Sequence, residues 1–139
     1  LAIYGSDILE AQQRKTIVNL RSAGLEGCVE VGRADLLDLP APAASGVLIA
    51  NPPYGVRLSD TAELEAFYPK LGDALKAHWT GWRCYFFSGD PALPKGVRLK
   101  ASKRTPLFNG AIECRLFEYQ MVAGSARKPK PSDNEELND

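Results

Sequence analysis

Hydrophobic and polar positions alternate along this chain in two patterns, which predict two kinds of element. Short apolar or β-prone runs at residues 1–5, 28–32, 46–50 and 82–88 predict strands. Two longer stretches, residues 8–23 before Gly24 and residues 61–79, predict helices. In the second stretch the apolar residues Leu64, Phe67, Leu71 and Leu75 recur at spacings of three and four, which places them on one buried face. Pro69 is expected to kink or divide that helix.

The last third of the chain has a different pattern. Two alternating runs, Val97–Phe108 and Ala111–Val122, flank Asn109 and Gly110, which predicts a β-hairpin. A short helix or turn is expected before them, at residues 89–96. Residues 124–139 are polar, contain prolines and carry almost no large apolar side chain, so a disordered tail is expected after one domain at residues 1–123.

Strands that alternate with helices, followed by a hairpin, predict an α/β fold of the Rossmann-like type. We expect an open, mostly parallel sheet with helices on both faces and an antiparallel hairpin at the end. The uninterrupted apolar run at residues 46–50 is typical of a central parallel strand covered on both faces. Such sheets bind ligands beyond the carboxyl ends of their strands. Asp7, Asp35 and Asn51 all follow or end predicted strands.

The candidate chemistry lies in the sequence NPPYG, residues 51–55, directly after the run at 46–50. The exocyclic amine of a nucleobase is a poor nucleophile, because its lone pair is delocalised into the ring. The side-chain oxygen of Asn51 and the carbonyl oxygen of Pro52 could accept hydrogen bonds from such an amine, and these bonds strengthen as charge develops on the nitrogen. Pro52 and Pro53 stiffen the turn, and Tyr54 offers a ring on which a base can stack. The alternative is an ordinary Asn-Pro turn.

Composition narrows the classes of protein. The chain has 139 residues, 45% of them hydrophobic, which is enough for one domain with a core. Lys plus Arg and Asp plus Glu are equal at 17 each, so any surface for nucleic acid must be local. Cys28, Cys84 and Cys114 are too few and too far apart for a disulfide framework or a zinc site, and we interpret them as core thiols. With no signal peptide or transmembrane run, we expect a cytoplasmic protein that does not contact membranes.

The motifs resemble those of a known family. The matching stretches are YGSDI (4–8), NLRSAG (19–24), GRADLLDL (32–39), NPPYGVRL (51–58), GW (81–82) and FNGAIECRL (108–116). They are similar to the C-terminal part of the S-adenosylmethionine-dependent ribosomal RNA methyltransferases that carry a THUMP domain ahead of a Rossmann-like catalytic domain. The resemblance implies methylation of the 2-amino group of a guanine in large-subunit (23S) ribosomal RNA. NPPY alone also occurs in adenine and glutamine methyltransferases.

The resemblance also implies roles for single residues. Asp7 would bind the ribose hydroxyls of S-adenosylmethionine with Ile8 against the adenine, although by itself Asp7 is as typical of a helix N-cap. Asp35, beside Leu36, would accept from the adenine amino group, and Asn51 would also contact the cofactor. Asn51, Pro52, Pro53 and Tyr54 would form the catalytic turn. No metal and no covalent intermediate are needed.

One family feature does not occur in these residues. No GxGxG-type loop is present, and in the family the strand that carries it lies between the strands expected at residues 1–5 and 46–50. Leu1 opens the sequence on an apolar run, so we interpret the chain as a piece of a longer protein. An upstream segment with this loop, and a THUMP domain, are the expected partners. The isolated piece should have an incomplete sheet, bind S-adenosylmethionine weakly or not at all, and be inactive.

A basic cluster surrounds the first strand of the expected hairpin. It contains Lys95, Arg98, Lys100, Lys103 and Arg104. Lys100, Lys103, Arg104 and also Arg57 are candidates for binding RNA phosphates. The alternatives are a solvated edge strand protected by lysines and a solvated loop arginine. Two other functions stay open for the whole chain: adenine N6 methylation on DNA or RNA, and a non-catalytic RNA-binding module.

Overall fold

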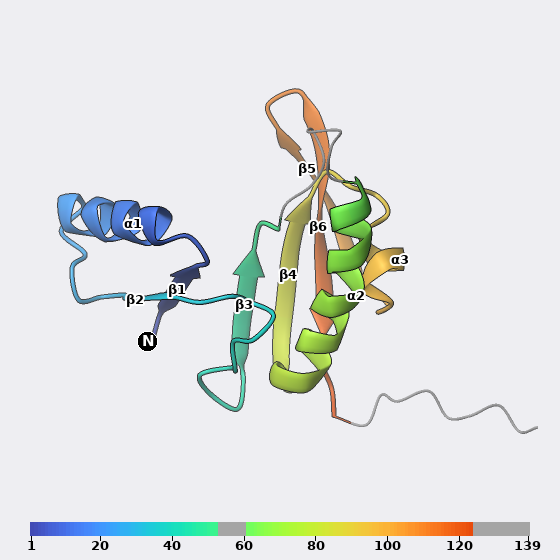
Figure 1. Ribbon diagram of the computed structural model, residues 1–139, viewed down its shortest axis with the longest axis horizontal. Helices are drawn as coiled ribbons and strands as arrows, with labels where there is room; N and C mark the ends of the chain where they lie inside the picture. The colour runs from blue at the N-terminus through green and yellow to red at the C-terminus, as the bar shows by residue number, and fades with distance from the viewer. Residues whose placement is uncertain (53–60, 124–139) are drawn as a thin grey trace, which may run out of the picture.

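The computed structural model describes residues 1–52 and 61–123 of the chain, coloured in Figure 1. The elements in chain order are β1 (Tyr4–Asp7), α1 (Glu10–Ser22), β2 (Glu30–Arg33), β3 (Gly46–Ala50), α2 (Thr61–His78), β4 (Trp82–Ser88), α3 (Leu93–Val97), β5 (Lys103–Asn109) and β6 (Ile112–Gln120). The expected disordered tail lies outside the described residues, and so does most of the NPPYG turn.

The strands form two separate sheets. β1 and β2 pair in parallel, with Asp7 opposite Arg33. The larger sheet has the order β3-β4-β6-β5, in which β3 and β4 are parallel while β6 is antiparallel to both β4 and β5. Within the described residues β1 and β3 are not paired with each other, so the expectation of an incomplete sheet is confirmed. The fold is α/β as predicted, but parallel and antiparallel pairings are equally frequent in it.

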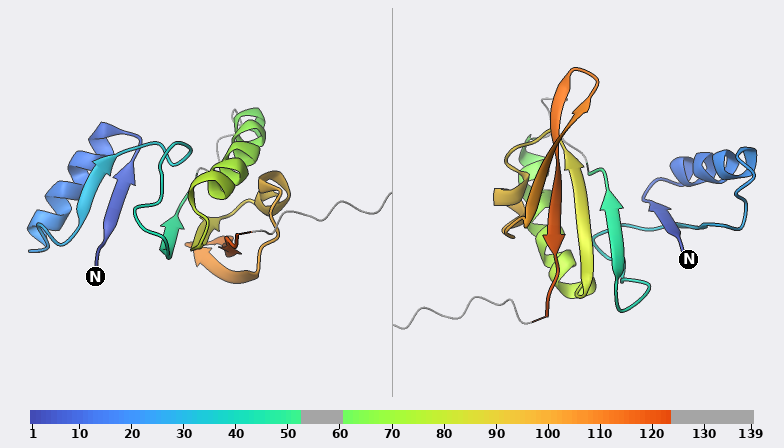
Figure 2. Two further views of the ribbon diagram at one scale, coloured as in Figure 1. Left: turned by 90° about the horizontal axis from the view of Figure 1, so that it is seen from below. Right: turned by 180° about the vertical axis from the view of Figure 1, so that it is seen from behind.

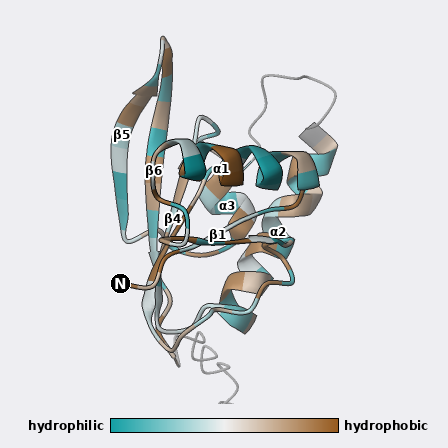
Figure 3. Cartoon of the chain, turned by 90° about the vertical axis from the view of Figure 1, so that its left-hand side faces the viewer, coloured by the Kyte–Doolittle hydropathy of each residue, from teal (hydrophilic) through white to brown (hydrophobic). Residues whose placement is uncertain are grey.

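The first three elements form what we call the N-terminal unit, consisting of β1, α1 and β2. It begins with a strand and a helix as predicted, and Gly24, with φ +70°, ends the helical segment in the left-handed conformation that glycine adopts easily. No residue of α1 is buried. Figure 3 shows hydrophilic turns on both sides of a hydrophobic turn in this helix. Cys28, expected in a core, is exposed in the connection between α1 and β2.

The remaining elements, β3 to β6 with α2 and α3, form what we call the C-terminal unit, and it contains the hydrophobic core. α2 packs on one face of its sheet (Figure 1). The largest buried side chains there include Leu71 and Leu75 of α2, Phe86 of β4, and Phe117 and Tyr119 of β6. Trp79 and Trp82 meet edge to face with ring centroids 5.0 Å apart. α2 and α3 are in close contact, because a Cβ on Gly72 of α2 would collide with the carbonyl oxygen of Val97 of α3.

The other face of the larger sheet corrects one prediction. In the view from behind in Figure 2, no helix lies over β3, β4 and β6. Val47 and Ile49 of β3 point to this face and are 58% and 71% exposed. β3 is therefore not covered on both faces, and one of its edges is unpaired within the described residues. An apolar run indicates a strand suited to burial, but its sequence does not say which segment covers it.

Two smaller predictions also differ from the structure. The expected strand at 97–108 begins only at Lys103, because Val97 ends the short helix α3 and Arg98 caps it in the left-handed conformation, with φ 60°. In α2, Tyr68 rather than Phe67 is fully buried against the core. Pro69 lies inside α2 without dividing it. The hairpin is confirmed, but its turn lies one residue later than predicted: Asn109 ends β5 and pairs with Ile112, so Gly110, with φ +61°, and Ala111 form the turn.

Candidate active site

The turn proposed for catalysis begins where β3 ends. Ala50 is the last residue of β3 and pairs with Phe86 of β4, so Asn51 follows the strand at the carboxyl edge of the parallel pair. Asn51 is exposed, whereas Pro52 is buried. The ring of Pro52 restricts its own φ angle, and Pro52 is buried. The side chain of Asn51, which precedes it, is therefore held in place at the edge of the sheet. Pro53, Tyr54 and Arg57 lie outside the described residues.

Two carboxylates lie at the carboxyl edge of the smaller sheet, in matching turns. Asp7 Oδ1 accepts a hydrogen bond from the backbone N–H of Leu9 at 2.8 Å, and Asp35 Oδ1 accepts one from Leu37 at 2.9 Å. The strands bring them together, because Ala34 N–H donates to the carbonyl oxygen of Asp7 at 3.1 Å. Each turn uses one carboxylate oxygen and, among the described residues, gives the second no hydrogen-bond partner.

This geometry refines the two interpretations of Asp7. The N-cap residue of α1 is Leu9, and its side chain makes no capping hydrogen bond. Asp7 orders the backbone just before it. The carboxylate therefore orders the entry to the helix and still has one oxygen for a ligand. Ile8 beside it is 54% exposed, so an apolar surface is available next to that oxygen. Leu36, beside Asp35, is half-buried and packs against the core of the C-terminal unit.

A bound nucleoside such as that of S-adenosylmethionine needs acceptors for its ribose hydroxyls and adenine amine, with an apolar surface for the ring. The second oxygens of Asp7 and Asp35 and the exposed side chain of Ile8 meet those needs at one sheet edge. The residues present therefore fit the cofactor that the motifs imply. Among the described residues no cluster of His, Cys, Asp or Glu has the geometry to hold a metal ion.

Sequence reasoning missed a pair of polar side chains that joins α2 to the turn after β4. The hydroxyl of Tyr68 donates to Asp90 Oδ2 at 2.6 Å, and Asp90 Oδ1 accepts from the N–H of Ala92 at 2.9 Å. Burial raises the pKa of the Tyr68 hydroxyl, and its bond to the Asp90 carboxylate adds to the effect, so this hydroxyl stays protonated as a donor. The GDP turn at residues 89–91 was a signal that could have placed Asp90 at a strand end.

The candidate RNA-binding cations do not form one patch. Lys100 lies in the connection between α3 and β5, and Lys103 and Arg104 are adjacent in β5. Side chains that are adjacent along a strand point to opposite faces, so Lys103 and Arg104 lie on different faces of the sheet. Arg104 lines a cavity of about 330 Å³ beside the end of β4.

Across the part of the chain that the structure describes, no helix combines the length and the apolar character that crossing a membrane requires.

Comparisons with known proteins identify similar sequences and similar folds. The chain is 39% identical over 131 residues to the ribosomal RNA large subunit methyltransferase K/L of Shewanella baltica, a match that covers 94% of this chain and 18% of that protein. The structure resembles the crystal structure of SMU.472 complexed with SAH, at a TM-score of 0.80 and 29% identity over 86% of this chain and 32% of the other. It also resembles a predicted N6-adenine-specific DNA methylase from Listeria monocytogenes, at a TM-score of 0.72 and 26% identity over 84% of this chain and 30% of that chain.

The chain thus spans about a fifth of the length of the curated relative, so what that whole protein does is not transferred by similarity alone. The fold, with its two parallel pairs and terminal antiparallel hairpin, is shared with Rossmann-like methyltransferases. The model of the UPF0020 family, described as the RMKL-like methyltransferase domain, matches residues 1–118, and the chain belongs to that family.

Proposed function

We propose that the protein transfers a methyl group from S-adenosylmethionine to the exocyclic 2-amino group of a guanine in large-subunit ribosomal RNA. The observation that carries the proposal is the exposed amide of Asn51 on buried Pro52, at the carboxyl end of β3. Membership of a methyltransferase family and the name of the Shewanella baltica relative support the reaction type and the RNA class.

The chain contributes positioning and polarisation. The oxygen of Asn51 and the carbonyl of Pro52 accept hydrogen bonds from the amine and draw its lone pair out of conjugation with the ring. As the nitrogen attacks, positive charge grows on it, so the same two bonds become stronger in the transition state than in the ground state. Tyr54, in the same motif, holds the base by stacking, which is worth roughly 1–3 kcal/mol per base.

The cofactor is bound by the N-terminal unit. Asp7 and Asp35 each offer one oxygen, to the ribose hydroxyls and the adenine amine respectively, while Ile8 and Leu36 pack beside the ring. S-adenosylmethionine supplies an activated methyl group when it is bound. In this proposal Asn51 also contacts the cofactor, and its amide limits the positions open to the incoming nitrogen.

The upstream partners stay part of the proposal. A segment with a glycine-rich loop would bind the methionine end of the cofactor, and its strand would pair between β1 and β3, whose facing edges are unpaired within the described residues. We place a THUMP domain in the same full-length protein. Because ribosomal RNA is the substrate, the cytoplasm is the compartment proposed.

Adenine N6 methylation is the second candidate, and the likeness to the Listeria monocytogenes protein favours it. Both amines are exocyclic and planar, so the Asn51 turn suits either of them. Incubating the full-length protein with ribosomal RNA and identifying the methylated nucleoside by mass spectrometry separates the two. N2-methylguanosine supports the proposal and N6-methyladenosine replaces it. Methylation of neither base, with RNA still bound, favours the non-catalytic module.

Replacement of Asn51 by Ala tests the mechanism in the full-length protein. Losing one transition-state hydrogen bond should lower kcat about 100- to 1,000-fold, while the affinity for RNA changes little. Asn19→Ala is the matched control, because Asn19 is an exposed residue of α1, remote in role from the turn. Turnover by Asn51→Ala equal to that of Asn19→Ala would remove Asn51 from the mechanism.

A further inference from the structure

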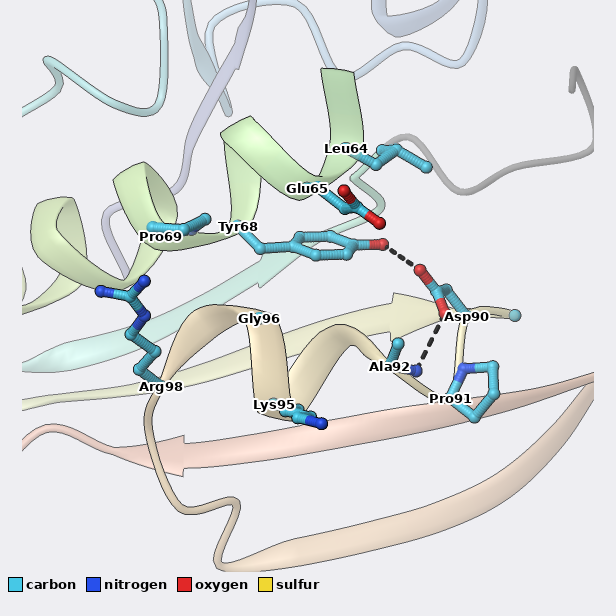
Figure 4. A pocket seen from close by; sticks show the side chains of 11 residues that line it. Leu64, Glu65, Tyr68, Pro69, Asp90, Pro91, Ala92, Lys95, Gly96 and Arg98 are labelled. Carbon is cyan, nitrogen blue, oxygen red and sulfur yellow. Dashed lines mark hydrogen bonds between the residues drawn. The ribbon is translucent and has the colours of Figure 1, made fainter. Parts of the chain in front are cut away.

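A cavity of about 740 Å³ lies between α2 and α3, and the proposed reaction does not use it. We call it the α2–α3 pocket; Glu65, Tyr68, Asp90, Lys95 and Arg98 are its polar lining residues (Figure 4). Its volume is within the range of about 300–1,000 Å³ typical of sites for small ligands. It is large enough to accept a single nucleotide.

The walls of the α2–α3 pocket are fixed in place. Asp90 binds both the Tyr68 hydroxyl and the N–H of Ala92, which ties α2 to the turn before α3. A Cβ on Gly96 would lie 2.6 Å from Cδ2 of Tyr68, so α3 packs directly against the tyrosine ring. A preformed pocket of this kind loses little entropy when a ligand enters.

Charged side chains of both signs line the α2–α3 pocket. Figure 4 shows Glu65 and Asp90 near the hydroxyl of Tyr68, with Arg98 at the opposite end of the ring, near Pro69, and Lys95 on α3. Among the described residues Lys95 and Arg98 form no ion pair, and the Glu65 carboxylate has none either. A ligand that suits this arrangement has an anionic group at one end and N–H donors at the other.

One wall of the α2–α3 pocket begins just after the carboxyl end of β4, the strand that pairs with β3. β3 and β4 are parallel neighbours, and β4 continues from Phe86 to Ser88 before the chain enters the pocket wall at Gly89. The smaller cavity that contains Arg104 shares Gly89 and Pro91 with it. Lys95 and Arg98 therefore line the α2–α3 pocket, and Arg104 lines the neighbouring cavity on the other side of the 89–91 turn.

We propose that the α2–α3 pocket binds a single-stranded nucleotide of the RNA that flanks the methylated base, with its phosphate at Lys95 and Arg98 and the amino group of its base at Glu65. A carboxylate accepts from an exocyclic amine but repels the carbonyl oxygen that uracil has at the same position as the amine of cytosine. The inference rests on the proposed function, since it takes the RNA substrate from there.

The first test measures RNA binding by the full-length protein carrying both Lys95→Ala and Arg98→Ala. The probe is a fluorescently labelled single-stranded RNA oligonucleotide with one central guanosine, titrated at several salt concentrations. Removing both cations from the one phosphate that they contact should weaken binding about tenfold and reduce the slope of log K against log salt by about 0.7. The affinity for S-adenosylmethionine, measured by calorimetry, should not change.

The matched control removes the same charge from outside the pocket. Lys70→Ala with Lys76→Ala deletes two exposed lysines of α2 that line neither cavity. Equal RNA affinities and salt slopes in the two double variants would overturn the inference. The proposed function fails by a different result, a wild-type protein whose methylated product is not N2-methylguanosine, so the two failures are distinguishable.

The second test addresses the base. A pool of oligonucleotides with randomised positions around the central guanosine is bound to the protein, and the bound fraction is sequenced. Wild type should deplete uridine at one flanking position, and Glu65→Gln, which keeps the shape of the side chain, should lose that depletion. The same sequence profile for both proteins would contradict the role of Glu65.

Discussion

The N-terminal and C-terminal units carry similar strand and helix patterns but bury very different amounts of side chain. Every side chain of the hydrophobic core belongs to the stretch from Leu64 to Tyr119, whereas α1 contributes none. α1 still carries Ile17, Val18 and Leu20, and Val18 is 56% exposed. The apolar side chains of an amphipathic segment are therefore buried only where a second layer packs against them.

The two units also divide the candidate chemistry. Asp7 and Asp35 lie in or next to the N-terminal unit, and Asn51 and the α2–α3 pocket belong to the C-terminal unit. A weakly packed region unfolds locally at lower free energy than a core region. Cofactor binding and substrate positioning should therefore respond differently to mutation.

Truncating the core should destabilise the chain most. Phe86 is fully buried between α2 and the larger sheet, so Phe86→Ala should cost about 3–5 kcal/mol of unfolding free energy in urea denaturation followed by circular dichroism. Val18→Ala, at an exposed apolar site of the N-terminal unit, should cost under about 0.5 kcal/mol. Similar losses for the two variants would mean that both units share one core.

Removing a charge from the N-terminal unit should change binding without changing the fold. Asp7→Asn retains the oxygen that accepts from Leu9 and loses the carboxylate, so affinity for S-adenosylmethionine in the full-length protein should fall about tenfold or more. Calorimetry measures the affinity. Asp38→Asn is the control, because Asp38 is an exposed aspartate that follows β2 by a few residues. An unchanged affinity for Asp7→Asn would exclude Asp7 from the cofactor site.

The cysteines should report the same contrast without perturbing the protein. Cys28 is exposed, while Cys84 and Cys114 are buried, and burial raises the pKa of the Cys84 thiol to about 12. Since the thiolate is the reactive form, iodoacetamide at mild alkaline pH should modify Cys28 quickly and the other two only after unfolding. Peptide mass spectrometry gives the order of modification, and rapid labelling of Cys84 would contradict the packing described.

The raised pKa of Cys84 also sets the sign of a pH effect. A thiol in the unfolded chain has a pKa near 8.5. Below that pH the Cys84 thiol is protonated in both the folded and the unfolded state, so its contribution to stability does not change with pH. As pH rises from there toward about 12, only the unfolded state loses the proton, so stability should fall by at most about 1.4 kcal/mol per pH unit. Urea denaturation across this range measures the slope, and Cys84→Ala should reduce it; an equal slope in the variant would contradict the assignment.

Sequence alone located the elements whose signals are local. Residues 46–50 and 82–88 are strands with the predicted bounds, and the predicted hairpin turns within one residue of the expected place, at Gly110 and Ala111, because glycine adopts the left-handed conformation easily. Asp7, Asp35 and Asn51 were placed at strand ends, where the structure has them. Their roles toward cofactor and substrate stay predictions.

Features that depend on distant partners were not accessible from the pattern. Val97 and Leu99 alternate as a strand would, yet Leu93–Val97 form a short helix that Arg98 caps, and this helix packs closely against α2. The exposure of Val47 and Ile49 and the bond from Tyr68 to Asp90 depend on which segments meet in space. Spacing along one strand or helix does not contain that information.

The edge-to-face pair of Trp79 and Trp82 has a consequence for anyone following this chain by spectroscopy. Both indoles of the sequence belong to the C-terminal unit, with Trp82 Nε1 donating to the carbonyl oxygen of Ala43 at 2.8 Å. Emission excited selectively in tryptophan therefore monitors one half of the molecule. Unfolding of β1, α1 and β2 would leave that signal almost constant. A single transition in tryptophan fluorescence would therefore overstate how cooperatively the whole chain unfolds.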